Sequence, residues 1–235
     1  MATIQASLNA VLERIALACK QSDRSPGSVK LLAVSKTHPA DSVKEAMDAG
    51  QKDFGENYLQ EAIEKIDKLK TYRSNITWHL IGPLQSNKTK LAAEYFDWVQ
   101  SVDRLKIAQR LSDQRPDHLP PLNICVQVNI SGEASKSGIN PEELSAFCIE
   151  IAKLKQLNLR GLMAIPEPGS NNLSHQAMGQ LFKETQLALA NAGLAKNFDT
   201  LSLGMSDDLE TAIASGSTMV RIGTAIFGAR PTKQA

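Results

Sequence analysis

The stretch VKLLAVSK at residues 29–36 indicates the kind of fold that this chain adopts. Its centre, Leu31-Leu32-Ala33-Val34, is apolar at odd and even positions alike, as expected of a strand that is covered on both faces in a parallel sheet. Further runs of strand length follow at residues 52–57, 76–82, 96–103, 122–130, 159–166, 200–206 and 219–228. The sequence therefore predicts a series of buried parallel strands.

Helical patterns occupy the segments between these runs. Apolar residues recur at helical spacing over residues 39–49, 57–70, 105–111, 140–157, 174–192 and 207–215. This alternation predicts an α/β fold, a single (β/α)8 TIM barrel that spans residues 1–235 as one domain. A doubly wound open sheet is the alternative, because periodicity alone does not show that a sheet closes.

Several details of the helices are expected from local signals. An amphipathic stripe over residues 4–19 predicts an extra N-terminal helix, which could cover the N-terminal end of the barrel. Asn140 and Asp103 are expected to cap the helices that follow them.

Charge and cysteine content exclude several classes of protein. Lys and Arg total 26 against 25 Asp and Glu, which offers no electrostatic basis for binding nucleic acid or an anionic membrane. No apolar stretch is long enough to span a bilayer, and the N-terminus lacks the pattern of a secretory signal. Three widely spaced cysteines form neither a disulfide framework nor a zinc site. We therefore expect a cytoplasmic protein.

Lys36 is the first candidate functional residue. Active sites of barrels form at the C-terminal ends of the strands, and Lys36 ends an otherwise apolar strand. Strand alternation places it on the face of Leu32 and Val34, directed into the top of the barrel. Partial desolvation there would lower the pKa of the amine and favour a Schiff base. A lysine that simply emerges into solvent is the alternative.

A candidate phosphate site lies after the last two predicted strands. Barrels often bind phosphate between these two loops. Ser206 is expected to cap a helix whose first backbone amides could bind an anion. On the adjacent strand, Gly223 lets the backbone approach a ligand closely and Thr224 adds a hydroxyl donor. Asp207 and Asp208 would repel phosphate unless their side chains turn away. Ordinary capping and turn glycines are the alternative interpretation.

Other polar residues carry weaker signals. Arg221 shares its strand face with Gly223, and its acceptor could be a neutral ring nitrogen, such as that of pyridoxal phosphate, or an intramolecular carboxylate. His79 follows Trp78 in an apolar strand, where a hydrogen-bonded core role is the commoner one. The histidines lack the spacing of metal ligands, and common nucleotide, hydrolase and zinc-protease motifs are absent from the sequence.

With these residues in place, the chain resembles the YggS/PROSC family of pyridoxal phosphate homeostasis proteins. The resemblance extends over nearly the whole chain, and no motif position departs from it. It is carried in order by LLAVSKTHPA (31–40), FGENYLQE (54–61), WHLIGPLQSNK (78–88), SGEASKSG (131–138), RGLMAIP (160–166), LSLGMSDDLETA (201–212) and STMVRIGTAIFGAR (217–230). No role for His79 or Lys136 follows from it.

The resemblance implies a fold-type III barrel like the N-terminal domain of alanine racemase, with pyridoxal 5′-phosphate as a Schiff base on Lys36. It further implies phosphate contacts at Ser206, Gly223 and Thr224, with Arg221 near the pyridine nitrogen and Asn57 beside the cofactor. No metal and no catalytic residue are implied. Such proteins carry the cofactor and help to balance vitamin B6 and amino-acid pools, without established catalytic turnover.

An active amino-acid racemase is the alternative function. Racemisation needs an acid and a base on opposite faces of the substrate, and the eighth predicted strand ends near Gly228, which leaves no room for a second domain that could supply one of them. Tyr58, Tyr72 and Tyr95 offer no evident replacement. A permanent cation at Arg221 also weakens the ring as an electron sink. We expect a non-catalytic monomer that passes its cofactor to apo enzymes or free amino acids, and a barrel that binds a sugar phosphate is a third interpretation.

Overall fold

Eight parallel strands form a closed barrel in the computed structural model, which describes residues 3–132, 137–167 and 172–229. The strands are β1 (Lys30–Val34), β2 (Asp53–Glu56), β3 (Thr77–Leu80), β4 (Trp98–Val102), β5 (Leu122–Gln127), β6 (Leu157–Met163), β7 (Thr200–Ser202) and β8 (Met219–Ile222). Each strand pairs with the next, and β1 pairs with β8. This closure confirms the predicted (β/α)8 barrel and contradicts the open sheet.

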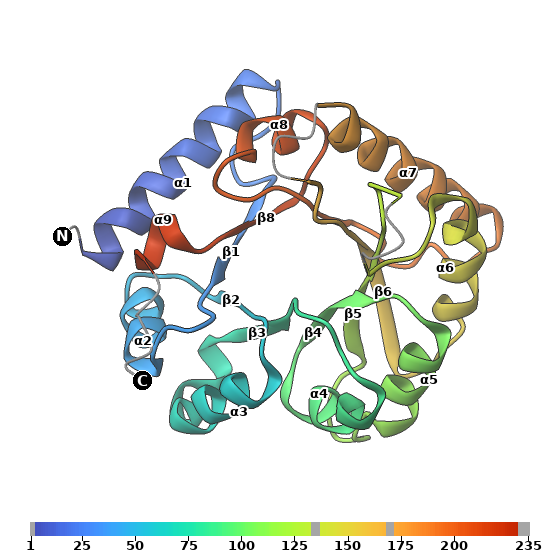
Figure 1. The fold of residues 1–235 in the computed structure, drawn as a ribbon, viewed down its shortest axis with the longest axis horizontal. Coiled ribbons are helices and arrows are strands. Elements are labelled where there is room, and N and C mark those ends of the chain that lie inside the picture. The colour runs from blue at the N-terminus through green and yellow to red at the C-terminus, as the bar shows by residue number, and fades with distance from the viewer. Residues whose placement is uncertain (1–2, 133–136, 168–171, 230–235) are drawn as a thin grey trace.

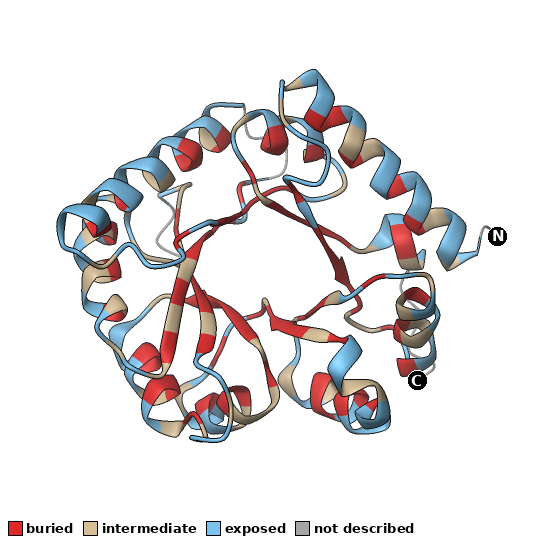
Figure 2. Cartoon of the chain, turned by 180° about the vertical axis from the view of Figure 1, so that it is seen from behind, coloured by how far each residue is buried: buried red, intermediate tan, exposed pale blue. Residues whose placement is uncertain are grey.

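Helices surround the barrel as an outer ring (Figure 1). They are α1 (Ile4–Gln21), α2 (Ala40–Asp48), α3 (Leu59–Lys68), α4 (Thr89–Tyr95), α5 (Leu105–Gln114), α6 (Leu144–Ala152), α7 (Asn172–Asn191), α8 (Leu209–Ala214) and α9 (Thr224–Phe227). Short 3-10 turns occupy Lys70–Asn75, Ser86–Lys88 and Pro141–Glu143. Strands and the inner faces of the helices are buried, whereas the outer faces of the helices are exposed (Figure 2).

The extra N-terminal helix does not cover the end of the barrel. Instead, α1 lies in the outer ring against α8, α9 and α2, beside β8 and β1 (Figure 1). Leu8, Val11 and Ile15 form its buried stripe. Because α8 and α9 are short, a third helix is needed to bury this part of the sheet.

Several boundaries differ from those expected. The run at 219–228 is a strand only to Ile222, because the chain then turns into α9. The helix expected from residue 140 begins as a 3-10 turn, and Asn140 makes no side-chain cap hydrogen bond. The N-cap of α5 is Arg104, not Asp103 as expected. Helix α4 follows β3 in a segment where no helix was expected. No helix among the described residues is long and apolar enough to cross a bilayer.

Candidate functional site

The predicted site residues meet at the C-terminal ends of four neighbouring strands, β7, β8, β1 and β2. Val34 is the register partner of Gly55, and Lys36 and Asn57 each lie two residues beyond this pair. Leu32 pairs with Arg221, which brings the end of β8 beside the end of β1. The amide of Arg221 donates to the carbonyl of Gly204 at the end of β7. One rim of the barrel therefore carries all these residues.

Lys36 lies in a tight turn just after β1, where its side chain is half-buried. The next residue, Thr37, has φ of 67°, a left-handed conformation that is costly for a β-branched side chain. Its backbone N–H donates to Glu61 Oε1 at 2.6 Å, and its hydroxyl is buried without a hydrogen-bond partner among the described residues. Strained backbone of this kind clusters at ligand sites, and this turn directly follows Lys36.

A buried charge network supports this turn from below. Lys65 of α3 donates to the carbonyl of Ser35 at 2.7 Å and forms ion pairs with Glu56 at 2.8 Å and Glu61 at 2.6 Å. The Ser35 hydroxyl donates to Glu56 at 2.6 Å. Burial raises the pKa of Glu56, although the bonds from Lys65 and Ser35 oppose that shift. The network ties α3 and β2 to the residue before Lys36.

Sequence reasoning missed the network around Lys65. Its signal is a charged residue at a helical position between Ala62 and Leu69, within the apolar stripe of α3. Such a lysine must find acceptors, because an unpaired buried ammonium is very costly. Two of its three partners are not local: Glu56 lies in β2 and Ser35 lies after β1, whereas Glu61 lies one turn away in α3.

Arg221 is buried inside the barrel wall, as its strand face predicts. Nη1 donates to the carbonyl of Ser202 at 2.6 Å and to its hydroxyl oxygen at 2.9 Å, and Nη2 donates to the carbonyl of Ala164 at 2.7 Å. These acceptors are neutral, so the carboxylate expected as one alternative is not among them. Burial lowers the pKa of Arg221 to about 10. The three bonds use three of the five guanidinium N–H donors and leave capacity for a ligand acceptor.

Gly223 and Thr224 form the start of α9, a short extra helix after the last strand. A Cβ on Gly223 would lie 3.1 Å from the carbonyl oxygen of Val34, so a larger residue would crowd β1. Thr224 is exposed and begins the helix. The first amides of a helix have no partner within it, and barrels bind phosphate at such short helices. The phosphate contacts expected at Gly223 and Thr224 stay a prediction.

The prediction that Ser206 caps α8 is wrong. The helix starts at Leu209 after Asp208, and Ser206 lies in the preceding turn. Its carbonyl accepts a hydrogen bond from Arg14 of α1 at 2.8 Å. The N-cap is instead Asp208, two residues later, whose carboxylate accepts a hydrogen bond from the backbone N–H of Met205 and closes the turn before the helix.

Asp208 does not face the phosphate site freely. Its second oxygen lies 2.8 Å from Nε2 of His175, a buried residue of α7. The carboxylate is therefore held by a backbone amide and an imidazole. Asp207 is exposed.

Asn57 follows β2 and packs closely against the end of β3. A Cβ on Gly82 would lie 2.1 Å from the carbonyl oxygen of Asn57, a distance that excludes any side chain at residue 82. This contact joins two of the sequence motifs in space. His79 lies in β3 and is fully buried. Lys136 lies outside the described residues, which contain no cluster of metal-binding side chains.

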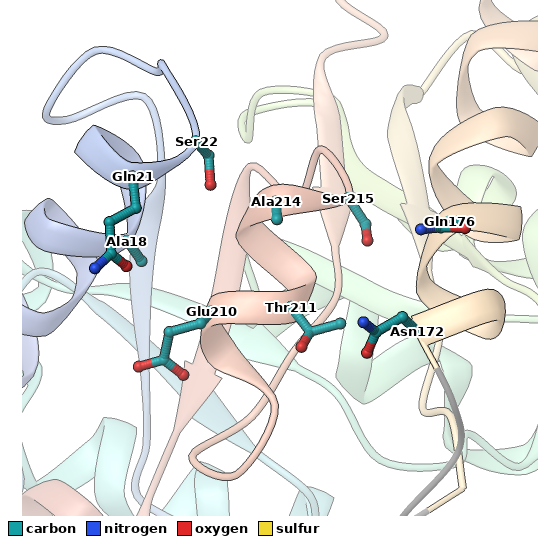
Figure 3. Close-up of a pocket in the computed structure, with 9 residues that line it drawn as sticks. All are labelled: Ala18, Gln21, Ser22, Asn172, Gln176, Glu210, Thr211, Ala214 and Ser215. Atoms are coloured by element: carbon teal, nitrogen blue, oxygen red, sulfur yellow. The ribbon is translucent and has the colours of Figure 1, made fainter.

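Two pockets lie near these elements, one at the C-terminal end of the barrel and one on its outer wall. One, of about 270 Å³, lies at the same end of the barrel beside Asn129 and Pro166, after β5 and β6. The other, of about 360 Å³, lies on the outer wall between α1, α8 and α7, among the side chains of Gln21, Gln176 and Thr211 (Figure 3). None of the predicted site residues lines this outer pocket.

Comparison with known proteins adds the following findings. Residues 7–231 match the family model described as alanine racemase, N-terminal domain. A pyridoxal phosphate homeostasis protein of Pseudomonas aeruginosa is 57% identical over 230 residues, which cover 98% of this chain and 97% of that protein. A protein of the same name from Escherichia coli K12 is 54% identical over 234 residues, or 98% of each.

Solved structures agree with these matches. PipY of Synechococcus elongatus, determined with pyridoxal 5′-phosphate bound, is 38% identical with a TM-score of 0.77, covering 91% of this chain and 100% of that chain. Alanine racemase of Corynebacterium glutamicum is 15% identical with a TM-score of 0.65, covering 97% of this chain and 63% of that chain. The latter likeness concerns the fold alone.

Proposed function

The chain belongs to the alanine racemase N-terminal domain family and, within it, to the pyridoxal phosphate homeostasis proteins, and from that premise we propose that it binds pyridoxal 5′-phosphate through Lys36 and serves the homeostasis of this cofactor and of amino acids. The observation that carries the proposal is the meeting of a strand-end lysine, a buried arginine and a short helix start on one rim. The PipY structure, determined with the cofactor bound, supports it.

Lys36 has the central role in this proposal. Bound at the rim, the cofactor supplies an aldehyde that condenses with a primary amine with loss of water. The strained turn at Thr37 and the Lys65 network hold the Lys36 backbone in place, so the amine stays at the end of β1. A fixed backbone reduces the entropy lost when the side chain is immobilised on its ligand.

The remaining groups bind and orient. Ser206, Gly223 and Thr224 are proposed to hold the phosphate, with the first amides of α9 as further donors. Arg221 is proposed to donate to the pyridine nitrogen, since its other bonds leave N–H groups unused. Asn57, opposite Lys36 in the β1–β2 register, is proposed to lie beside the ring.

We propose that the protein is a carrier and regulator rather than a racemase. Racemisation needs two proton-transfer groups on opposite faces of the substrate carbon. Tyr72 and Tyr95 precede β3 and β4, at the opposite end of the barrel, and Tyr58 is exposed. A permanently charged donor such as Arg221 also disfavours a protonated ring nitrogen.

Absorbance and chemical trapping test the binding. The purified protein mixed with pyridoxal 5′-phosphate should develop a visible band that borohydride abolishes, and peptide mapping should then place the pyridoxyl group on Lys36. Lys36→Ala should fold, as judged by circular dichroism, and give no such band. A pyridoxyl group found only on another lysine would refute the assignment.

Isotope exchange tests the absence of turnover. L-amino acids incubated with the loaded protein in deuterated water should exchange their α-proton no faster than with free cofactor. Exchange at an enzymatic rate, lost in Lys36→Ala, would favour the racemase instead, and Tyr58→Phe would then identify the second base. In parallel, loaded protein mixed with an apo enzyme or with free amino acids should release its cofactor to them.

Two further properties belong to the proposal. A monomer is sufficient, because every residue assigned to the site comes from one chain, and sedimentation at working concentration tests this. A cytoplasmic location agrees with three buried, unpaired thiols, since burial raises the pKa of Cys125 and Cys148 and makes them inert. We also propose that residues 1–235 act as one domain.

A further inference from the structure

A continuous chain of hydrogen bonds crosses the interior of the barrel and ends on Arg221. It begins at the first residue of β2, at the end of the barrel opposite the proposed cofactor site. The side chains between its two ends are fully buried. Its members, in order, are Asp53 of β2, His79 of β3, Gln100 of β4, Ser202 of β7 and Arg221 of β8.

Each link has hydrogen-bond geometry. Asp53 Oδ1 lies 3.0 Å from His79 Nε2, and His79 Nδ1 lies 3.0 Å from Gln100 Nε2. Ser202 Oγ lies 2.7 Å from Gln100 Oε1 and 2.9 Å from Arg221 Nη1. These residues come from five of the eight strands, so the chain links elements on opposite sides of the barrel.

The carboxylate end fixes the direction of every bond. An ionised Asp53 can only accept, so His79 carries its proton on Nε2 and donates it to Asp53. Nδ1 of the neutral ring then accepts from the amide nitrogen of Gln100, which leaves Gln100 Oε1 to accept the hydroxyl proton of Ser202. Arginine can only donate, so the Ser202 oxygen accepts from Arg221.

The charges agree with this direction. Burial lowers the pKa of His79, so the ring is neutral and Nδ1 remains an acceptor, although Asp53 and Asp97 oppose that shift. Burial alone would raise the pKa of Asp53, but the hydrogen bond with His79 and the nearby Lys30 and Lys52 outweigh it and keep the carboxylate ionised. The series of hydrogen bonds thus has the Asp53 carboxylate at one end and the Arg221 guanidinium at the other.

We infer that Asp53 is a positioning residue for Arg221, acting through His79, Gln100 and Ser202. Asp53 sets the donor and acceptor order along the series of hydrogen bonds, so the Ser202 oxygen serves as an acceptor for Arg221 Nη1. This contact holds the guanidinium in one orientation. Its unused N–H donors then stay available to the pyridine nitrogen. The inference rests on the proposed function, because it concerns how Arg221 meets the cofactor.

Without the Asp53 carboxylate, the donor and acceptor order of these hydrogen bonds should no longer be fixed. In Asp53→Ala, His79 can carry its proton on Nδ1, and the Gln100 amide then turns over to present its nitrogen to Ser202. We expect pyridoxal 5′-phosphate to bind about fivefold more weakly, with a shifted absorption maximum of the bound cofactor. Asp53→Asn keeps a carbonyl acceptor for His79 and should restore both to within about twofold of wild type.

A second pair of variants separates positioning from stability. Ser202→Ala removes the link to Arg221, whereas Ser217→Ala removes an equally buried hydroxyl that contacts the carbonyls of Leu201, Leu203 and Met219 but not Arg221. Both should lower the thermal unfolding temperature to a similar degree. Only Ser202→Ala should weaken cofactor binding and shift the absorption maximum.

Nitrogen NMR of cofactor-free protein gives a readout that does not depend on the proposed function. Wild-type His79 should be protonated on Nε2, and the proton should move to Nδ1 in Asp53→Ala. A wild-type ring protonated on Nδ1 would overturn the inference whether or not the cofactor binds. So would unchanged affinity and absorbance in Ser202→Ala, the decisive variant if Asp53→Ala does not fold. A wild-type protein that takes up no cofactor would instead refute the proposed function.

Discussion

Replacing Lys65 with methionine tests whether the buried charge network holds the Lys36 turn. The lysine side chain is 6% exposed and Glu56 is fully buried. Lys65→Met keeps the length and most of the apolar stem of the side chain but removes the ammonium, and with it the bonds to Ser35, Glu56 and Glu61. The buried carboxylate of Glu56 then loses its cation.

The cost follows from which partners are buried. Breaking a buried ion pair by removing one member costs about 3–5 kcal/mol, because the other charge stays desolvated. Glu56 keeps its bond from the Ser35 hydroxyl and can take up a proton, which reduces the penalty. Glu61 is 31% exposed, so its pair adds only ~0–1 kcal/mol. We expect the free energy of unfolding to fall by about 3 kcal/mol at pH 8.

Urea denaturation measured at two pH values gives the assay. Burial already raises the pKa of Glu56, and loss of Lys65 raises it further. Folding then becomes linked to proton uptake, so the deficit of Lys65→Met relative to wild type should shrink as the pH falls from 8 to 5. Lys153→Met, which breaks an exposed pair with Glu150, is the control and should cost ~0–1 kcal/mol at both pH values.

A double variant completes the test. Glu56→Gln combined with Lys65→Met leaves no buried charge and should be more stable than Lys65→Met alone. Cofactor affinity should fall in both, since the carbonyl of Ser35 loses its anchor. The reasoning would be refuted by a loss below ~1 kcal/mol in Lys65→Met, or by a deficit that does not change with pH.

Three further predictions concern the phosphate site, the barrel rim and the interior. Ser206→Ala should weaken binding of pyridoxal 5′-phosphate by about 1–3 kcal/mol in a titration while leaving pyridoxal binding unchanged; equal losses for both ligands would contradict the phosphate role. Gly82→Ala should lower the thermal unfolding temperature sharply, because its Cβ would lie 2.1 Å from the Asn57 carbonyl oxygen. The pKa of His79 is lowered by burial, so the unfolded chain takes up a proton that the folded one does not, and stability should fall as the pH drops below about 6.5. His79→Gln should show a smaller decline over that range.

Much of the fold and part of the site could be predicted because the signals are local. The apolar run from Leu31 to Val34 identifies a doubly covered strand whatever it pairs with, and repetition of that pattern predicts an α/β fold whose closure into a barrel the structure confirms. Lys36, Arg221 and Gly223 could be singled out for the same reason: strand ends and strand faces follow from the pattern, and barrels place their sites at those ends.

Predictions that depended on how segments meet were less secure. Ser206 was expected to cap α8, but the helix starts three residues later because Asp208 binds the amide of Met205 and the ring of His175. The stripe of α1 predicted a buried face but not its place, which is set by the sheet surface that the short α8 and α9 leave uncovered.

The amino-acid sequence by itself thus determined the strands, their alternation with helices and the residues at the strand ends, because hydrophobic periodicity and chain direction are properties of neighbouring residues. Only the tertiary structure decided how the polar interior is connected. Lys65 meets Ser35 across 30 residues of sequence, and Ser202 meets Gln100 across 102. Closure of the barrel makes these pairings, and a buried polar group takes whichever partner the fold brings within hydrogen-bond distance.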